Sequence, residues 1–341
     1  MGNQVFAACK AGNAEEIRRL ISSGQLEVNT KINGATPLHW ACQYKKIEAV
    51  EVLLELKADI DATSKGGNTP LHITAMENSY EIMLLLINSG ANVSAKNEEG
   101  ITPMHIVCQY SHMEALKMLL SKGASVMVKD NVGNTPLHVA CTMAKDIIFA
   151  PLLTLGADLM ARTDDGSTPL HYACRHNRLR AMNFLMANGV DVNAQNNAKQ
   201  TPLHDACGYG HIEAAHLLIA CGADTTAVDM NGRTPSQLSS FETARALSVV
   251  MTEWSARSAE FSAEIAEMVK FLKSFNIPTN TASLVAHQIV ITHKLNTLPK
   301  LQEMCRNEPA KMKDTFRGMG IDDKTVGRLM SSLAGGTCVI A

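Results

Sequence analysis

Short apolar stripes separated by polar turns recur along most of the chain, with the spacing of amphipathic helices. In one unit, residues 38–42 form a first stripe and residues 47–56 form a second. Thr36 can cap the first helix with its hydroxyl, and Pro37 suits the first helical position because its missing N–H costs nothing there. The pattern therefore predicts a pair of short helices in each unit.

This unit recurs with a fixed period. Thr-Pro dipeptides begin every 33 residues, and all but the last continue as TPLH or TPMH. In most units a Gly follows the second helix, where it permits a left-handed C-cap. Such repetition predicts a solenoid in which each unit packs on its neighbours. The dipeptides begin at Thr36, Thr69, Thr102, Thr135, Thr168, Thr201 and Thr234.

The period and the TPLH motif resemble the ankyrin repeat family over about residues 1–250. The resemblance implies an all-α solenoid of about eight units, terminal caps included, and we assign residues 1–254 to it. Residues 1–33 should form the first cap, and the degenerate unit after Gly232 the last one. Pro151 lies inside one predicted second helix, where we expect a kink or a shortened helix.

Two residue types recur at fixed repeat positions and invite a chemical interpretation. Periodicity alone leaves a metal or catalytic role open for the histidines, but the resemblance implies local hydrogen bonds and a bridge to the next repeat. We expect the cysteines to be small buried groups, without disulfides, metal or cofactor. The residues are His39, His72, His105, His138, His171 and His204, and Cys9, Cys42, Cys108, Cys141, Cys174 and Cys207.

Composition and motifs favour binding over catalysis. The formal net charge is −2, which does not favour nucleic acid as a partner. The sequence contains no phosphate-binding loop, nucleophile elbow or zinc-protease motif, so we predict that the protein is not an enzyme. An enzyme carried by residues 255–334 is disfavoured because that segment lacks a catalytic constellation.

In ankyrin proteins the ligand usually lies on a concave face made by the turns and by exposed positions of the first helices. The residues at those positions here are rich in aromatic and Met side chains, which commonly anchor a protein or peptide partner. We predict partner contacts at Trp40, Tyr44, Ile73, Met76, Tyr110, Met143, Tyr172, Arg175 and Tyr209.

The period ends before a second predicted domain. Residues 262–334 show helix-length apolar patterns, and we expect about five short helices there. A Gly-Ile turn at residues 320–321 and the Gly327-Arg328 pair, expected at the start of the last helix, resemble a SAM domain. That resemblance implies self-association, and a generic helical bundle is the alternative.

Residues 335–341 form a predicted flexible tail that ends in Cys338-Val-Ile-Ala, a C-a-a-X box of the type read by farnesyltransferase. One prenyl chain anchors a protein reversibly, and stable residence needs a second signal. The sequence predicts neither a secretory signal nor a bilayer span. We therefore expect a cytoplasmic protein with peripheral membrane association.

Together these features predict a protein-binding adaptor or scaffold. A partner protein or peptide would lie in the ankyrin groove, and prenylation of Cys338 would attach the complex reversibly to a membrane. The alternative is a soluble regulatory or inhibitory subunit of an enzyme, for which the tail is irrelevant.

Overall fold

The computed structural model describes residues 2–24, 27–143, 146–239, 268–275, 277, 285–286, 298–307, 309–318, 321 and 323–333. The chain divides into two compact units, Met1–Asp158 and Leu159–Ala341, and we describe each by itself. Every regular element in the described ranges is helical, which confirms the all-α prediction.

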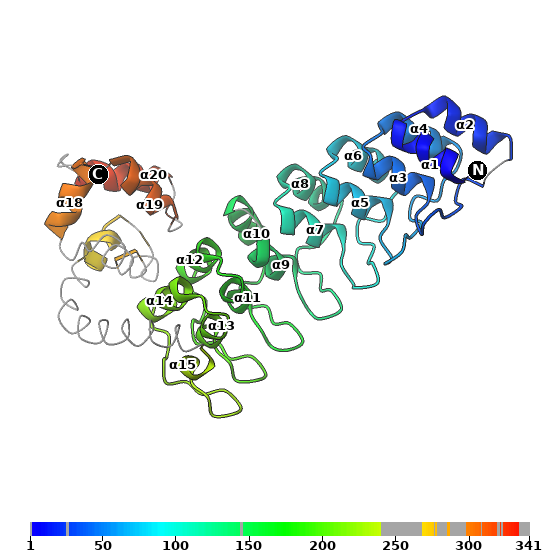
Figure 1. Ribbon diagram of the computed structural model, residues 1–341. Coiled ribbons are helices and arrows are strands. Elements are labelled where there is room, and N and C mark those ends of the chain that lie inside the picture. The colour runs from blue at the N-terminus through cyan, green and yellow to red at the C-terminus, as the bar shows by residue number, and fades with distance from the viewer. Residues whose placement is uncertain are drawn as a thin grey trace. The chain divides into compact units, whose positions relative to one another are not determined.

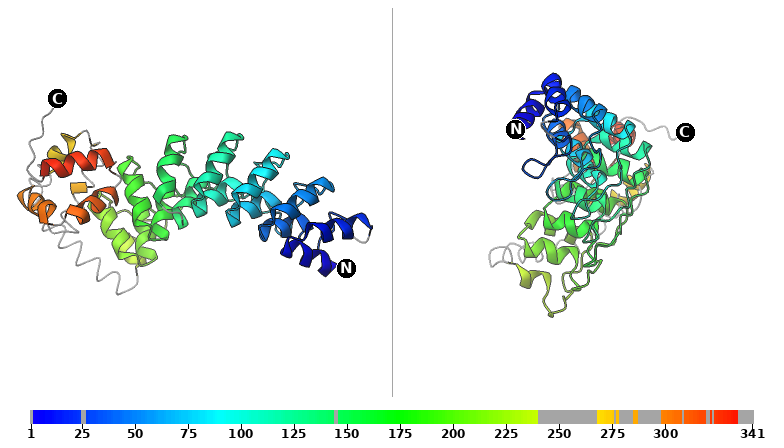
Figure 2. Two further views of the ribbon diagram at one scale, coloured as in Figure 1. Left: turned by 90° about the horizontal axis from the view of Figure 1, so that it is seen from above. Right: turned by 90° about the vertical axis from the view of Figure 1, so that its right-hand side faces the viewer.

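Unit 1 consists of successive helix pairs joined by long turns (Figure 1). The first helices of the pairs pack side by side, and Figure 2 shows the same row from two other directions. They are α1 (Gly2–Ala11), α3 (Pro37–Gln43), α5 (Pro70–Glu77), α7 (Pro103–Tyr110) and α9 (Pro136–Met143). The second helices are α2 (Ala14–Ser22), α4 (Ile47–Glu55), α6 (Tyr80–Asn88), α8 (Met113–Ser121) and α10 (Phe149–Thr154).

Unit 2 continues the same pattern. Its first helices are α11 (Pro169–Arg175), α13 (Pro202–Gly208) and α15 (Pro235–Leu238), and its second helices are α12 (Leu179–Ala187) and α14 (Ile212–Ala220). Near the C-terminus lie α18 (Leu298–Asn307), α19 (Pro309–Gly318) and α20 (Asp323–Leu333), which share an apolar core around Leu301, Phe316 and Leu329. Helix α20 begins at Asp323, so Gly327-Arg328 lies inside this helix and does not open it as expected.

The TPLH motifs fold as the sequence indicates. Thr168 is the N-cap of α11 and Pro169 its first residue. The His171 ring completes the cap, because its Nδ1 accepts from the Thr168 backbone N–H at 3.1 Å. The ring is buried, and its Nε2 meets the Gln200 carbonyl oxygen of the next turn at 3.0 Å.

The same bridge recurs 29 residues apart in other repeats, and we call this series the histidine ladder. Because Nδ1 accepts an N–H, the ring proton lies on Nε2, which donates to the carbonyl. The implied structural role of these histidines is confirmed in every repeat where both bonds are described. The remaining bridges join His39 to Asn68, His72 to Ile101, His105 to Asn134 and His204 to Arg233.

Departures from the repeat have the expected local effects. A 3₁₀ turn, Asp146–Ile148, precedes α10, and this helix spans only Phe149–Thr154 around Pro151. A proline inside a helix removes one hydrogen bond and crowds the preceding turn, which explains the shortened helix. Lys57, which replaces the usual Gly after a second helix, adopts a left-handed φ of 64°.

The recurrent cysteines are small core groups, as predicted. All six are buried in first helices, and none forms a disulfide with another described residue. Burial raises the pKa of the Cys9 thiol to about 12 and that of Cys207 to about 11. These thiols are therefore protonated at neutral pH and unreactive as nucleophiles.

Candidate functional site

All nine predicted contact residues lie on first helices or at the residue that ends one. Met76, Tyr110, Met143 and Tyr209 are exposed, whereas the other five are half-buried. The repeat position alone does not decide exposure, because Ile106 is buried whereas Ile73 and Tyr172, at the same position of other repeats, are half-buried.

In unit 1, three neighbouring first helices present an apolar surface. Met76 on α5, Tyr110 on α7 and Met143 on α9 are 40%, 47% and 48% exposed, although exposed large apolar side chains cost free energy unless a partner covers them. The Tyr110 ring stacks on the His112 ring at 5.7 Å, and His112 Nδ1 is bonded to the Ala75 carbonyl at 2.9 Å. Tyr110 is therefore held in a fixed orientation.

An aromatic cluster lies at the N-terminal end of the same unit. The Trp40 ring packs edge-on against Phe6 at 4.9 Å and stacks on Tyr44 at 6.5 Å. Lys10 Nζ lies 5.3 Å from the Tyr44 ring centroid, so this ring already interacts with a cation. Phe6 was not predicted as part of the surface, because residues 1–33 lack the motif that sets the register. Trp40 Nε1 is buried without a hydrogen-bond partner among the described residues.

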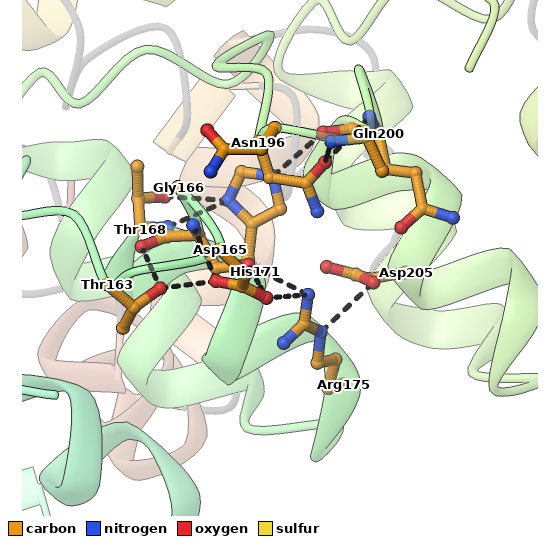
Figure 3. A network of polar contacts seen from close by, with 12 residues as sticks. Thr163, Asp165, Gly166, Thr168, His171, Arg175, Asn196, Gln200 and Asp205 are labelled. Carbon is orange, nitrogen blue, oxygen red and sulfur yellow. Dashed lines mark hydrogen bonds and ion pairs between the residues drawn. The ribbon is translucent and has the colours of Figure 1, made fainter. Parts of the chain in front are cut away.

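In unit 2 the half-buried Arg175 joins two first helices and a turn (Figure 3). Its Nε pairs with Asp205 Oδ1 of α13 at 3.1 Å, and its Nη2 lies 3.7 Å from Asp165 Oδ2. The same Nη2 donates to Ser167 Oγ at 2.8 Å. The guanidinium carbon lies 5.4 Å from the centroid of the Tyr172 ring, in a cation–π contact.

Asp205 is the unusual member of this network. The equivalent positions in the preceding repeats hold Trp40, Ile73, Ile106, Val139 and Tyr172. Asp205 is only 6% exposed, and its Oδ2 has no hydrogen-bond partner within the described part of the chain. Burial raises its pKa to about 6, although Arg175 acts in the opposite direction. A carboxylate at an otherwise apolar position signals a constraint other than stability.

The other two charges remain ionised. Burial alone would raise the pKa of Asp165, but hydrogen bonds from Thr163 and Ser167 lower it below the usual value. The pKa of Arg175 is raised, because Asp205 and Asp165 outweigh the effect of burial. The sequence named Arg175 as a contact but did not indicate its pairing, because the partners come from separate elements.

Tyr209 lies next to this network in the chain and is 62% exposed. Its ring stacks on His211 at 6.3 Å, and His211 Nε2 bonds the Arg175 carbonyl oxygen at 3.0 Å. The exposed ring and the Arg175 backbone are therefore fixed by one histidine.

Two other features are absent from the described residues. No group of three or more His, Cys, Asp or Glu residues there is arranged to hold a metal ion. No described helix has both the length and the apolar character needed to cross a bilayer. Cys338 and the predicted tail lie outside the described residues.

A family model for ankyrin repeats (3 copies) matches residues 5–97, 71–163 and 143–229. The chain is similar to the crystal structure of the ankyrin repeat domain of Bcl-3, described as a unique member of the IkappaB protein family. The TM-score is 0.52 at 28% identity, covering 63% of this chain and 99% of that one. One chain of the structure of a predatory endopeptidase from Bdellovibrio bacteriovorus in complex with an immunity protein matches with a TM-score of 0.49 at 24% identity, covering 53% of this chain and 96% of that one.

One curated relative is similar over a short stretch. The palmitoyltransferase akr1 of Schizosaccharomyces pombe is 41% identical over 59 residues, which are 17% of this chain and 9% of the relative. This chain therefore spans less than a tenth of that protein.

Proposed function

Because this chain belongs to the ankyrin repeat family, we propose that it is a protein-binding adaptor whose first helices hold a segment of a partner protein. The observation that carries this proposal is that three neighbouring first helices each expose a large apolar side chain, at Met76, Tyr110 and Met143. Interfaces draw most of their binding energy from a few aromatic and other large side chains of this kind. The network around Arg175 and the exposed Tyr209 offer a second contact region in unit 2.

The proposal is tested by placing a photo-activatable phenylalanine analogue at position 110 of the full chain in cells. A matched control carries it at Leu153, which is 36% exposed on the second helix α10. We expect cross-linked protein from position 110 and little from position 153. The Tyr110→Ala variant should then weaken binding of the purified partner by about 10-fold, in line with an interface anchor. Equal cross-linking from both positions would contradict the proposal.

Membrane attachment is a separate proposal and rests on the sequence of the tail. A prenyl group on Cys338, with self-association through residues 262–334, would give the two signals that stable residence needs. The intact mass and membrane fraction of the full chain from a eukaryotic cell should differ from those of Cys338→Ser. An unmodified mass would contradict membrane attachment through Cys338. It would favour the alternative, in which the protein is a soluble regulatory or inhibitory subunit of an enzyme.

A further inference from the structure

The guanidinium group of Arg175 is held on three sides by its own unit. Its Nε pairs with Asp205, and its Nη2 donates to Ser167 Oγ and lies near Asp165. The Tyr172 ring covers one face of the group. These contacts fix both the position and the plane of a side chain that is ordinarily mobile.

The third guanidinium nitrogen remains available. Nη1 forms no hydrogen bond or ion pair with the described residues, and no dashed line reaches it in Figure 3. It is not among the buried unpartnered atoms, and the side chain is 19% exposed, so its N–H groups reach solvent. A donor oriented in advance loses little conformational entropy when an acceptor binds.

The surrounding charges decide which acceptor fits. Asp205 and Asp165 are the two carboxyl groups that act on Arg175, so these three side chains together carry one more negative than positive charge when all are ionised. A carboxylate of the partner would meet this excess negative charge. An uncharged carbonyl oxygen meets no such repulsion and still accepts from a charged donor, in the stronger class of hydrogen bonds.

We propose that Nη1 of Arg175 binds a main-chain carbonyl oxygen of the partner segment. Tyr209 supplies an exposed ring for the flanking side chains, because His211 links this ring to the Arg175 backbone. The carboxylate of Asp205 then has a physical role, since it holds the guanidinium in place despite the cost of its own burial. This assignment rests on the proposed function and adds the chemistry of one contact.

The test uses short random peptides selected by display on the full chain and then synthesised. In each selected peptide, every amide is replaced in turn by an ester, whose carbonyl is a weaker acceptor. We expect one position at which the ester weakens binding to the wild-type chain by about 10-fold and has little further effect on Arg175→Lys. That coupling identifies the carbonyl that Arg175 binds.

One charge-removing variant separates a neutral acceptor from a carboxylate. Asp164→Asn removes one negative charge from the same turn without altering a bond of Arg175, and it should change the affinity less than about 2-fold if the acceptor is neutral. A several-fold increase in affinity, with strong salt dependence and a required Asp or Glu in the peptide, would show a carboxylate and overturn the proposal.

Urea unfolding shows whether each variant is folded. The ester series measured on the wild-type chain changes only the peptide, so its result does not depend on the folding of any variant. Peptides that need Tyr209 but show no coupling at any ester position would refute the Arg175 contact while leaving the adaptor function intact. If no peptide is enriched on the chain, both proposals fail.

Discussion

Replacing His171 by Gln should remove an acid-sensitive contribution to stability without removing the helix cap. The His171 ring is buried, with Nδ1 accepting from Thr168 and Nε2 donating to Gln200. The last repeat already shows how the variant can be accommodated. There Gln237 Oε1 accepts from the Thr234 backbone N–H at 2.8 Å, so an amide can complete the same cap.

The magnitude follows from the pKa of the ring. Burial, with help from the Arg175 charge, lowers the pKa of His171 from 6.5 to about 4. The unfolded chain therefore binds this proton first as the pH falls, and the folded state loses stability between about pH 6.5 and pH 4. At about 1.4 kcal/mol for each pH unit, the loss from this one residue is about 3 kcal/mol.

The assay compares urea unfolding of the wild-type chain and His171→Gln from about pH 7.5 to about pH 4.5, followed by far-UV circular dichroism. At the higher pH the variant should be less stable by about 1 kcal/mol, because the bond to Gln200 is lost. At the lower pH the variant should be the more stable of the two proteins. The other ladder histidines titrate in both proteins, so their contributions cancel in the difference between the two free energies of unfolding. A constant difference across the whole range would refute the reasoning.

Three further predictions concern other features. The pKa of Asp205 is raised in the folded chain, so the wild-type free energy of unfolding falls as the pH rises from about 4 to about 6. The free energy of unfolding of Asp205→Asn, relative to that of wild type, should therefore rise by about 3 kcal/mol over that range. A Cβ on Gly67 would lie 2.6 Å from the Glu98 backbone nitrogen, whereas one on Gly123 meets nothing within 4 Å. Both residues have positive φ, so in thermal unfolding Gly67→Ala should cost clearly more than the ~1–2 kcal/mol expected for Gly123→Ala. Leu86→Ala should destabilise unit 1 by about 2–5 kcal/mol in urea unfolding, because the side chain is fully buried in α6.

The repeat architecture was predictable because its causes are local. A Thr-Pro start, an apolar stripe and a following Gly each act within one helix, and their period then requires a stack. The shortened α10 was predictable for the same reason, since Pro151 acts on its own helical turn.

The surface was only partly predictable. Exposure at one repeat position depends on the neighbouring repeats, which is why Ile106 is buried while Ile73 and Tyr172, at the same position, are half-buried. The pairing of Arg175 with Asp165 and Asp205 joins a turn and two helices, and no spacing rule covers those distances. A sequence signal was nevertheless present, because Asp205 interrupts a series of apolar and aromatic residues at one repeat position.

The histidine ladder also bears on how such a chain can evolve. Each described rung joins one motif to the carbonyl 29 residues later, so it involves adjacent repeats and no others. A genetic duplication or deletion of 33 residues among the repeats that carry the TPLH or TPMH motif would recreate the rung at the new junction, whereas one of another length would not. Recombination can therefore lengthen or shorten the proposed binding surface by one repeat at a time, and each exposed Tyr or Met is added or removed together with the folded module that presents it.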